Sequence, residues 1–244
     1  MLLLLPSETS ATSILSASAK PRPSLPSIRY TNRVKPTTHH VFREPRWPAL
    51  IAMLAAAGIS LALPEHLLLG PAWLPLTIVG ILMVPIAVSH SRGLHHIVRR
   101  LILVANVILT LAMIASLALL IQGIPLHRET PTALLRSAAA LWMANILIFA
   151  LWYWKLDAGG PMRRELPGAM AHSAFYFPQF ARDAESHWLP GFVDYLYLSF
   201  NTSTAFSPTD TPTLSRWAKL AGMLQSIISL MVLALLAARA VNIL

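Results

Sequence analysis

A run of polar residues interrupts the apolar C-terminal part of this 244-residue chain, and its residue types are those that handle ions. Hydroxyl and amide side chains fill positions 201–204, and another hydroxyl and a carboxylate follow at 207 and 210. Polar groups at membrane depth are tolerated where they are buried in protein or line water, and channels present such oxygens to cations. An ion or solute path is therefore one functional hypothesis. Its candidate residues are Asp194, Asn201, Thr202, Ser203, Thr204, Ser207, Asp210, Gln225 and Ser229.

The same polar run also has a structural interpretation, which stays open. Ser, Thr and Asp beside a proline are typical of helix caps and turns, and residues 207–210 read Ser-Pro-Thr-Asp. Asp194 in a first helical turn would be favoured by the helix dipole, and Asp210 could pair with Arg216. On this interpretation the run ends one helix and caps the next.

Small and polar residues inside the apolar segments favour helix packing. In lipid they usually allow close contact and hydrogen bonds between helices. Asn106 and Asn145 could hydrogen-bond each other for this reason. Four such residues are spaced three or four apart and so share one face of the last helix: Gly222, Gln225, Ser226 and Ser229.

Composition places the chain in a membrane. Hydrophobic residues make up 55% of it and charged residues only 12%, a balance that a soluble protein of this size would struggle to cover with polar surface. The absence of cysteine excludes disulfides and thiolate metal sites. The net charge of +9 gathers in residues 1–46 and at the ends of apolar runs, as expected for contact with the bilayer and its anionic headgroups. No groove-reading motif accompanies it, so no nucleic acid is expected.

The apolar segments must position the polar run, and a helix needs about 20 residues to cross a bilayer core. The chain is predicted to be an all-α polytopic membrane helical bundle with five or six membrane segments. Four crossings are expected at 47–63, 74–88, 101–121 and 132–154, a short or re-entrant helix at 191–206 and a final helix at 220–240. The corresponding regions are a disordered basic tail (1–46), a four-helix transmembrane region (47–155), an amphipathic interfacial connection (156–190), and the short helix plus final helix (191–244).

Charge distribution predicts orientation. The basic tail and the loops around residues 92–100 and 155–182 fall on one side if four helices cross before Lys155, so the N-terminus is expected in the cytoplasm of a multi-pass inner-membrane protein. A targeting peptide is the alternative for the tail, because "MLLLLPSETSATSILSASAK" contains a small-residue Ala-Ser-Ala site.

The last 90 or so residues carry a resemblance. "WYWKLDAGGP", "FYFPQF" and "FVDYLYLSFNTSTAFSPTDTPTLSRW" resemble the C-terminal region of a family of uncharacterised bacterial integral membrane proteins, a domain of unknown function. The resemblance implies a membrane fold and no established activity. The matching residues are Asp194, Tyr197, Ser199, Phe200, Asp210, Ser215, Arg216 and Asn242.

The same stretch is more distantly similar to the two-helix pore module of potassium channels, with a pore helix, a filter and an inner helix. A potassium filter needs glycines so that successive carbonyls can point into the pore, whereas "TAFSPTD" has none and contains Pro208. A potassium channel also enters its pore loop from outside, contrary to the charge distribution. The similarity therefore implies a channel-like module without potassium selectivity.

Motif analysis offers no catalytic, cofactor or metal site. The chain lacks a GxSxG elbow, a Walker A loop and a GxGxxG fingerprint. Histidines at 39–40, 90 and 95–96 have neither thiolate nor helical carboxylate partners, so headgroup contact is the expected role. Two functions are favoured: channel-like permeation through residues 191–229, which would require a homo-oligomer, or a non-transport scaffold or partner-binding subunit whose polar residues serve helix packing. A membrane-embedded enzyme is a third hypothesis, and it would need a buried acid or histidine pair.

Overall fold

The computed structural model describes residues 45–91, 95–123, 130–182, 188–207 and 210–241, with side chains omitted at 86–91, 95, 182 and 239–241. All of these belong to one unit, Val41–Leu244. Every regular element in these ranges is a helix, as predicted from the sequence. Most of the predicted basic tail lies outside the described residues, as do His39 and His40.

The first four long helices form at the predicted apolar segments. They are α1 (Trp47–Gly58), α2 (Leu74–Ser91), α3 (His95–Gly123) and α4 (Pro131–Leu156). The 3-10 turn η1 (Ile59–Ala62) continues α1, and the short η2 (Glu65–Leu67) lies between η1 and α2. Thr130 caps α4, because its hydroxyl accepts a hydrogen bond of 3.3 Å from the N–H of Ala133, and Pro131 suits the first helical position.

The end of α4 is a sharp stop, as the Asp-Ala-Gly-Gly sequence predicts. Gly160 has a φ of 98°, and a Cβ there would lie 2.9 Å from the carbonyl oxygen of Lys155, so glycine is required. The chain continues through η3 (Asp157–Gly159), α5 (Pro161–Arg164), η4 (Ala169–His172) and α6 (Gln179–Arg182) to α7 (Phe192–Thr204) and α8 (Arg216–Val241).

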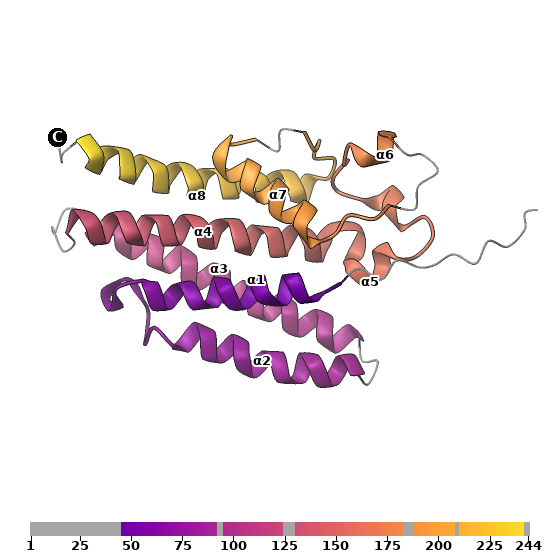
Figure 1. The fold of residues 1–244 in the computed structure, drawn as a ribbon, viewed down its shortest axis with the longest axis horizontal. Helices are drawn as coiled ribbons and strands as arrows, with labels where there is room; N and C mark the ends of the chain where they lie inside the picture. Colours follow the sequence, from indigo (N-terminus) through magenta and orange to yellow (C-terminus); the bar gives the residue numbers. More distant parts are fainter. Residues whose placement is uncertain (1–44, 92–94, 124–129, 183–187, 208–209, 242–244) are drawn as a thin grey trace, which may run out of the picture. The chain divides into compact units, whose positions relative to one another are not determined.

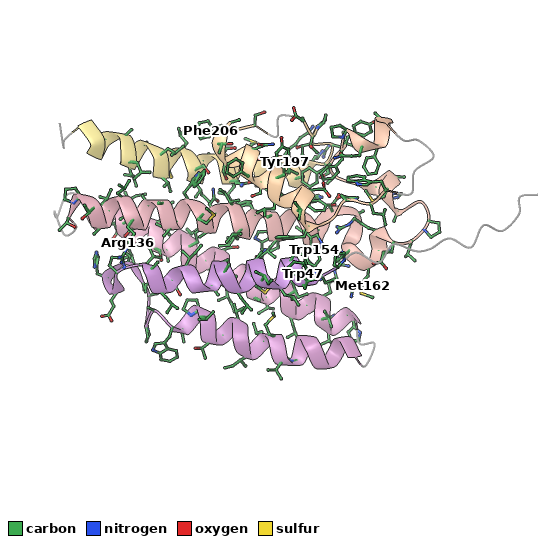
Figure 2. All side chains as sticks on the ribbon, in the orientation of Figure 1. Trp47, Arg136, Trp154, Met162, Tyr197 and Phe206 are labelled. Carbon is green, nitrogen blue, oxygen red and sulfur yellow. The ribbon has the colours of Figure 1, made fainter. Side chains whose placement is uncertain are left out.

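Helix α4 is the centre of the packing. It contacts α1, α3, α7 and α8, while α2 packs on α1 and α3 (Figure 1). Small buried residues such as Ala138, Ala144 and Ala150 line α4 and let its neighbours approach closely. At its N-terminal end Arg136 reaches back to the carbonyl oxygen of Ala62, at 3.1 Å (Figure 2).

Three of the described helices are long and apolar enough to cross a membrane: His96–Gly123, Pro131–Gly159 and Arg216–Ala238. These three helices agree with the prediction that the chain is a membrane protein. Two apolar helices are shorter, Trp47–Ala62 and Leu74–Pro85. Large apolar side chains are exposed on the outer surface, among them Trp47 and Tyr197 (Figure 2), as expected where lipid is the solvent.

The connection between α4 and α7 carries aromatic residues that pack inward. Phe175 and Phe177 are buried, and the ring of Phe175 meets those of Tyr153, Tyr195 and Trp217 edge-on at 5.2 to 6.2 Å between centroids. The sequence suggested an interfacial position for this aromatic segment. The structure adds that Phe175 and Phe177 of this segment are buried in the protein interior, and the interfacial position stays a prediction.

Candidate functional site between α4, α7 and α8

A buried glutamine joins the three C-terminal helices. The side chain of Gln225 on α8 is 0% exposed, and its oxygen accepts a hydrogen bond of 2.6 Å from the hydroxyl of Tyr153 on α4. Its nitrogen lies 2.8 Å from the carbonyl oxygen and 2.7 Å from the hydroxyl of Ser199, and 2.8 Å from the hydroxyl of Ser203. Both serines are on α7. Gln225 therefore uses both amide hydrogens and one acceptor position of its oxygen inside the protein.

Two further polar residues extend this Gln225 cluster along α4 and α8. Asn145 donates from its amide nitrogen to the hydroxyl of Ser229 at 2.8 Å and to the backbone carbonyl of Gln225 at 3.2 Å. Ser199 donates to the carbonyl oxygen of Ile146 at 2.7 Å. The expected pairing of Asn145 with Asn106 is therefore wrong: Asn145 faces α8, and the buried amide of Asn106 has no hydrogen-bond partner within the described part of the chain.

A second buried cluster lies at the C-terminal end of α4, around Asp157. Its carboxylate accepts hydrogen bonds from the hydroxyl of Ser173 at 2.9 and 3.0 Å, from the N–H of Ala174 at 2.5 Å and from the hydroxyl of Tyr195 at 2.5 Å. The carboxylate thus ties the connection after α4 to the first turns of α7. Charge-assisted bonds of this kind are the stronger ones in proteins.

Arg164 on α5 completes the Asp157 cluster. Its guanidinium is buried, donates to the backbone carbonyls of Trp154 at 2.6 Å and Asp157 at 3.3 Å, and lies 4.9 Å from the centre of the Tyr195 ring. A cation over an aromatic face is an attractive contact. Asp157 and Arg164 line neither the pocket between α7 and α8 nor the pocket beside Lys155. This is consistent with a structural role for both residues.

The predicted path residues divide into a buried and an exposed group. Ser203, Gln225 and Ser229 lie in the Gln225 cluster, and the hydroxyl of Thr202 donates to the carbonyl of Leu198 at 2.8 Å. Asn201 and Asp194 are half-buried, whereas Thr204, Ser207 and Asp210 are exposed.

The two acids of the candidate path differ in their surroundings: Asp194 is half-buried and Asp210 is exposed. Asp194 stands in the first turn of α7, as the structural interpretation predicted, and its carboxylate also accepts a hydrogen bond of 2.8 Å from the N–H of Gly191. Asp210 forms no ion pair with Arg216, although both residues belong to the described part of the chain.

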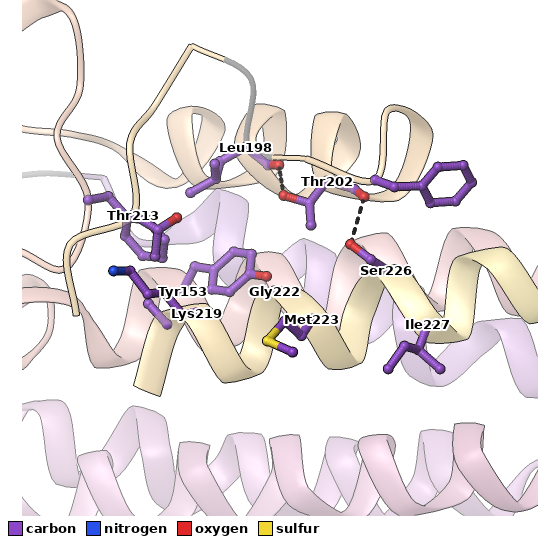
Figure 3. Close-up of a pocket in the computed structure, with 12 residues that line it drawn as sticks. Tyr153, Leu198, Thr202, Thr213, Lys219, Gly222, Met223, Ser226 and Ile227 are labelled. Atoms are coloured by element: carbon purple, nitrogen blue, oxygen red, sulfur yellow. Dashed lines mark hydrogen bonds between the residues drawn. The ribbon is translucent and has the colours of Figure 1, made fainter. Parts of the chain in front are cut away.

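A pocket of about 520 Å³ opens between α7 and α8 beside the Gln225 cluster. Its walls are mostly apolar, and Figure 3 shows Met223 and Ile227 of α8 facing it with Thr202 and Ser226. The Ser226 hydroxyl lies 3.4 Å from the carbonyl of Thr202 and bridges the two helices. Lys219 contributes the charged part of the lining.

Comparisons of this chain with protein-family models, with curated proteins and with solved structures find no match. Function is therefore inferred from the contacts and burial of the site itself. Within the described ranges, His, Asp and Glu side chains do not gather in groups of three or more that could hold a metal ion.

Sequence reasoning did not single out Asp157, Tyr153 or Tyr195 as members of polar clusters. The available signal was an acid directly after an apolar helix, followed by a hydroxyl-bearing residue at position 173. The signal is weak, because pairing across 16 or 38 residues depends on the turn geometry.

Proposed function

We propose that this chain is a non-transport integral membrane protein, a partner-binding subunit in which the Gln225 cluster fastens α4, α7 and α8 into a fixed support. The observation that carries the proposal is that the side chain of Gln225 is fully buried and that both its amide oxygen and its amide nitrogen are hydrogen-bonded, to Tyr153, Ser199 and Ser203. A side chain that lines a permeation path must offer its polar atoms to the ion or to water. Here those atoms are occupied by the protein.

The proposed arrangement in the membrane has α7 entering and leaving on one side. It is supported by contacts at both ends of the segment: Tyr195 bonds Asp157, and the return chain pairs with the same connection, since Leu214 donates to the carbonyl of Ala174 at 2.7 Å. With α1 and α2 as a further hairpin, five crossings and one re-entrant helix result. The positive-inside rule favours the inner membrane with the basic end in the cytoplasm.

The partner we propose for the pocket between α7 and α8 is an acyl chain of a membrane lipid. The pocket volume of about 520 Å³ lies within the usual range for ligand sites, about 300–1,000 Å³. Met223 and Ile227 line the pocket and are also exposed on a helix apolar enough to span, so the pocket borders the surface that lipid would cover. Lys219 could meet a polar headgroup at the same place.

Ion flux tests the non-transport proposal. Purified protein in liposomes with a monovalent-cation gradient is expected to give the same leak as empty liposomes, and Thr204→Ala and Asp210→Asn should change nothing. Equal incorporation and helix content of the three proteins provide the control. A flux above that of empty liposomes that falls in either variant would reject the proposal.

Channel-like permeation is the second candidate, and the exposure of Thr204, Ser207 and Asp210 after α7 favours it. In a single protomer these groups are exposed at the surface. An ion path would therefore require several copies of the chain whose exposed segments converge on one axis. Chemical cross-linking in the membrane would then give a closed oligomer, and the flux experiment would give the positive outcome.

A further inference from the structure

A second pocket, of about 310 Å³, lies among the N-terminal end of α1, the first turns of α3, the end of α4 and α5. It shares no lining residue with the pocket between α7 and α8. Its charged and titratable lining is entirely basic: Arg46, His96, Arg99, Lys155 and Arg163. These residues come from four separate elements, so the fold, and not a local run in the sequence, gathers them.

Lys155 is the unusual member of this basic pocket. Its side chain is only 7% exposed, and it has no hydrogen bond or ion pair to any described residue. Arg99, Arg46 and Arg164 are close enough to act on it by electrostatic repulsion. A buried charge without a partner is costly, and three like charges nearby add to that cost.

The neighbouring acids do not neutralise this charge. Glu165 lies 4.0 Å from Arg46, and the Asp157 carboxylate accepts its hydrogen bonds from Ser173, Ala174 and Tyr195. The pocket thus retains an excess of positive charge around a buried amine. An anion with several acceptor oxygens would offset it, and phosphate suits both the planar guanidinium of Arg99 and the point charge of Lys155.

We propose that the pocket formed by Arg46, His96, Arg99, Lys155 and Arg163 binds a phosphate-bearing anion, held by Lys155 and Arg99. Two sources carry this chemistry: the headgroup of an anionic phospholipid and a soluble phosphate. Basic pockets between membrane helices are recognised sites for lipid headgroups. The inference does not depend on whether the protein transports ions, nor on occupancy of the pocket between α7 and α8.

Native mass spectrometry of the full-length chain in detergent tests the proposal with three probes added separately. They are phosphatidylglycerol, diacylglycerol with the same acyl chains, and inorganic phosphate. Lys155→Met and Arg99→Gln remove proposed ligands. Arg100→Gln is the matched control, because Arg100 is the adjacent exposed arginine on α3 and does not line the pocket.

We expect phosphatidylglycerol to bind the native chain more tightly than diacylglycerol does. The affinity for phosphatidylglycerol should be about tenfold lower in Lys155→Met and in Arg99→Gln, and unchanged in Arg100→Gln. If inorganic phosphate alone shows this dependence, the source is soluble phosphate. Lys155→Met should also be more heat-stable than the native chain without phosphate, since it removes a buried unpaired charge. The proposal is overturned if neither phosphate probe depends on Lys155, or if Arg100→Gln weakens binding as much as Arg99→Gln.

Discussion

The hydroxyl of Tyr153 donates a hydrogen bond of 2.6 Å to the side-chain oxygen of Gln225, 72 residues further along the chain. This contact joins the last turns of α4 to α8. The amide nitrogen of the same Gln225 side chain bonds two serines of α7. One side chain therefore holds three helices together.

Gln225→Leu is expected to lower the free energy of unfolding by about 2 kcal/mol, because it leaves the hydroxyls of Tyr153, Ser199 and Ser203 with fewer buried partners. Unfolding by denaturant in detergent, followed by circular dichroism, measures the change. Gln122→Leu is the control, since Gln122 is exposed near the end of α3. Equal stability of both variants would contradict a fastening role for the cluster.

The two asparagines at membrane depth should respond in opposite directions. Asn145→Leu removes hydrogen bonds to α8 and is expected to destabilise the protein by about 1 kcal/mol. Asn106→Leu replaces a buried amide that has no partner in the described structure and should stabilise it by about 1 kcal/mol. The same unfolding measurement compares them. Destabilisation by both changes would mean that Asn106 has a polar partner of its own.

Asp157 and Tyr195 are expected to act as a coupled pair. Asp157→Asn weakens three charge-assisted contacts and should cost about 2–3 kcal/mol, while Tyr195→Phe should cost about 1–2 kcal/mol. The double variant should cost less than the sum, with a coupling of about 1 kcal/mol. Asp210→Asn, at an exposed acid, provides the control and should stay within about 0.5 kcal/mol of the native chain. Additive single effects would argue against a direct bond.

If the pocket between α7 and α8 binds an acyl chain, as proposed, filling the pocket should exclude that chain. Gly222→Leu places a large side chain in the lining, whereas Gly80→Leu adds the same bulk to α2, where a Cβ meets nothing within 4 Å. A palmitic acid with a photoreactive diazirine should cross-link native protein and Gly80→Leu within residues 198–227, and Gly222→Leu several-fold less. Mass spectrometry locates the cross-links. Labelling spread evenly over every exposed apolar helix would count against a defined acyl site.

Several features of this fold follow from local sequence alone. Apolar runs at 47–63, 74–88, 101–121, 132–154 and 220–240 predicted helices, and the structure has helices there. The stop after Leu156 and the cap at Asp194 were also predictable. Helix formation, capping and turns depend on neighbours within about four residues, so the linear order contains the information they need.

Only the tertiary structure decided which polar groups meet. The sequence showed that Gln225 and Ser229 share a helix face, but not that this face packs on Tyr153 and Asn145, more than 70 residues away. It showed that Lys155 ends an apolar helix, but not that its amine is buried among arginines from other elements. Such partnerships depend on helix rotation and on turns such as the one at Gly160, which no local periodicity specifies.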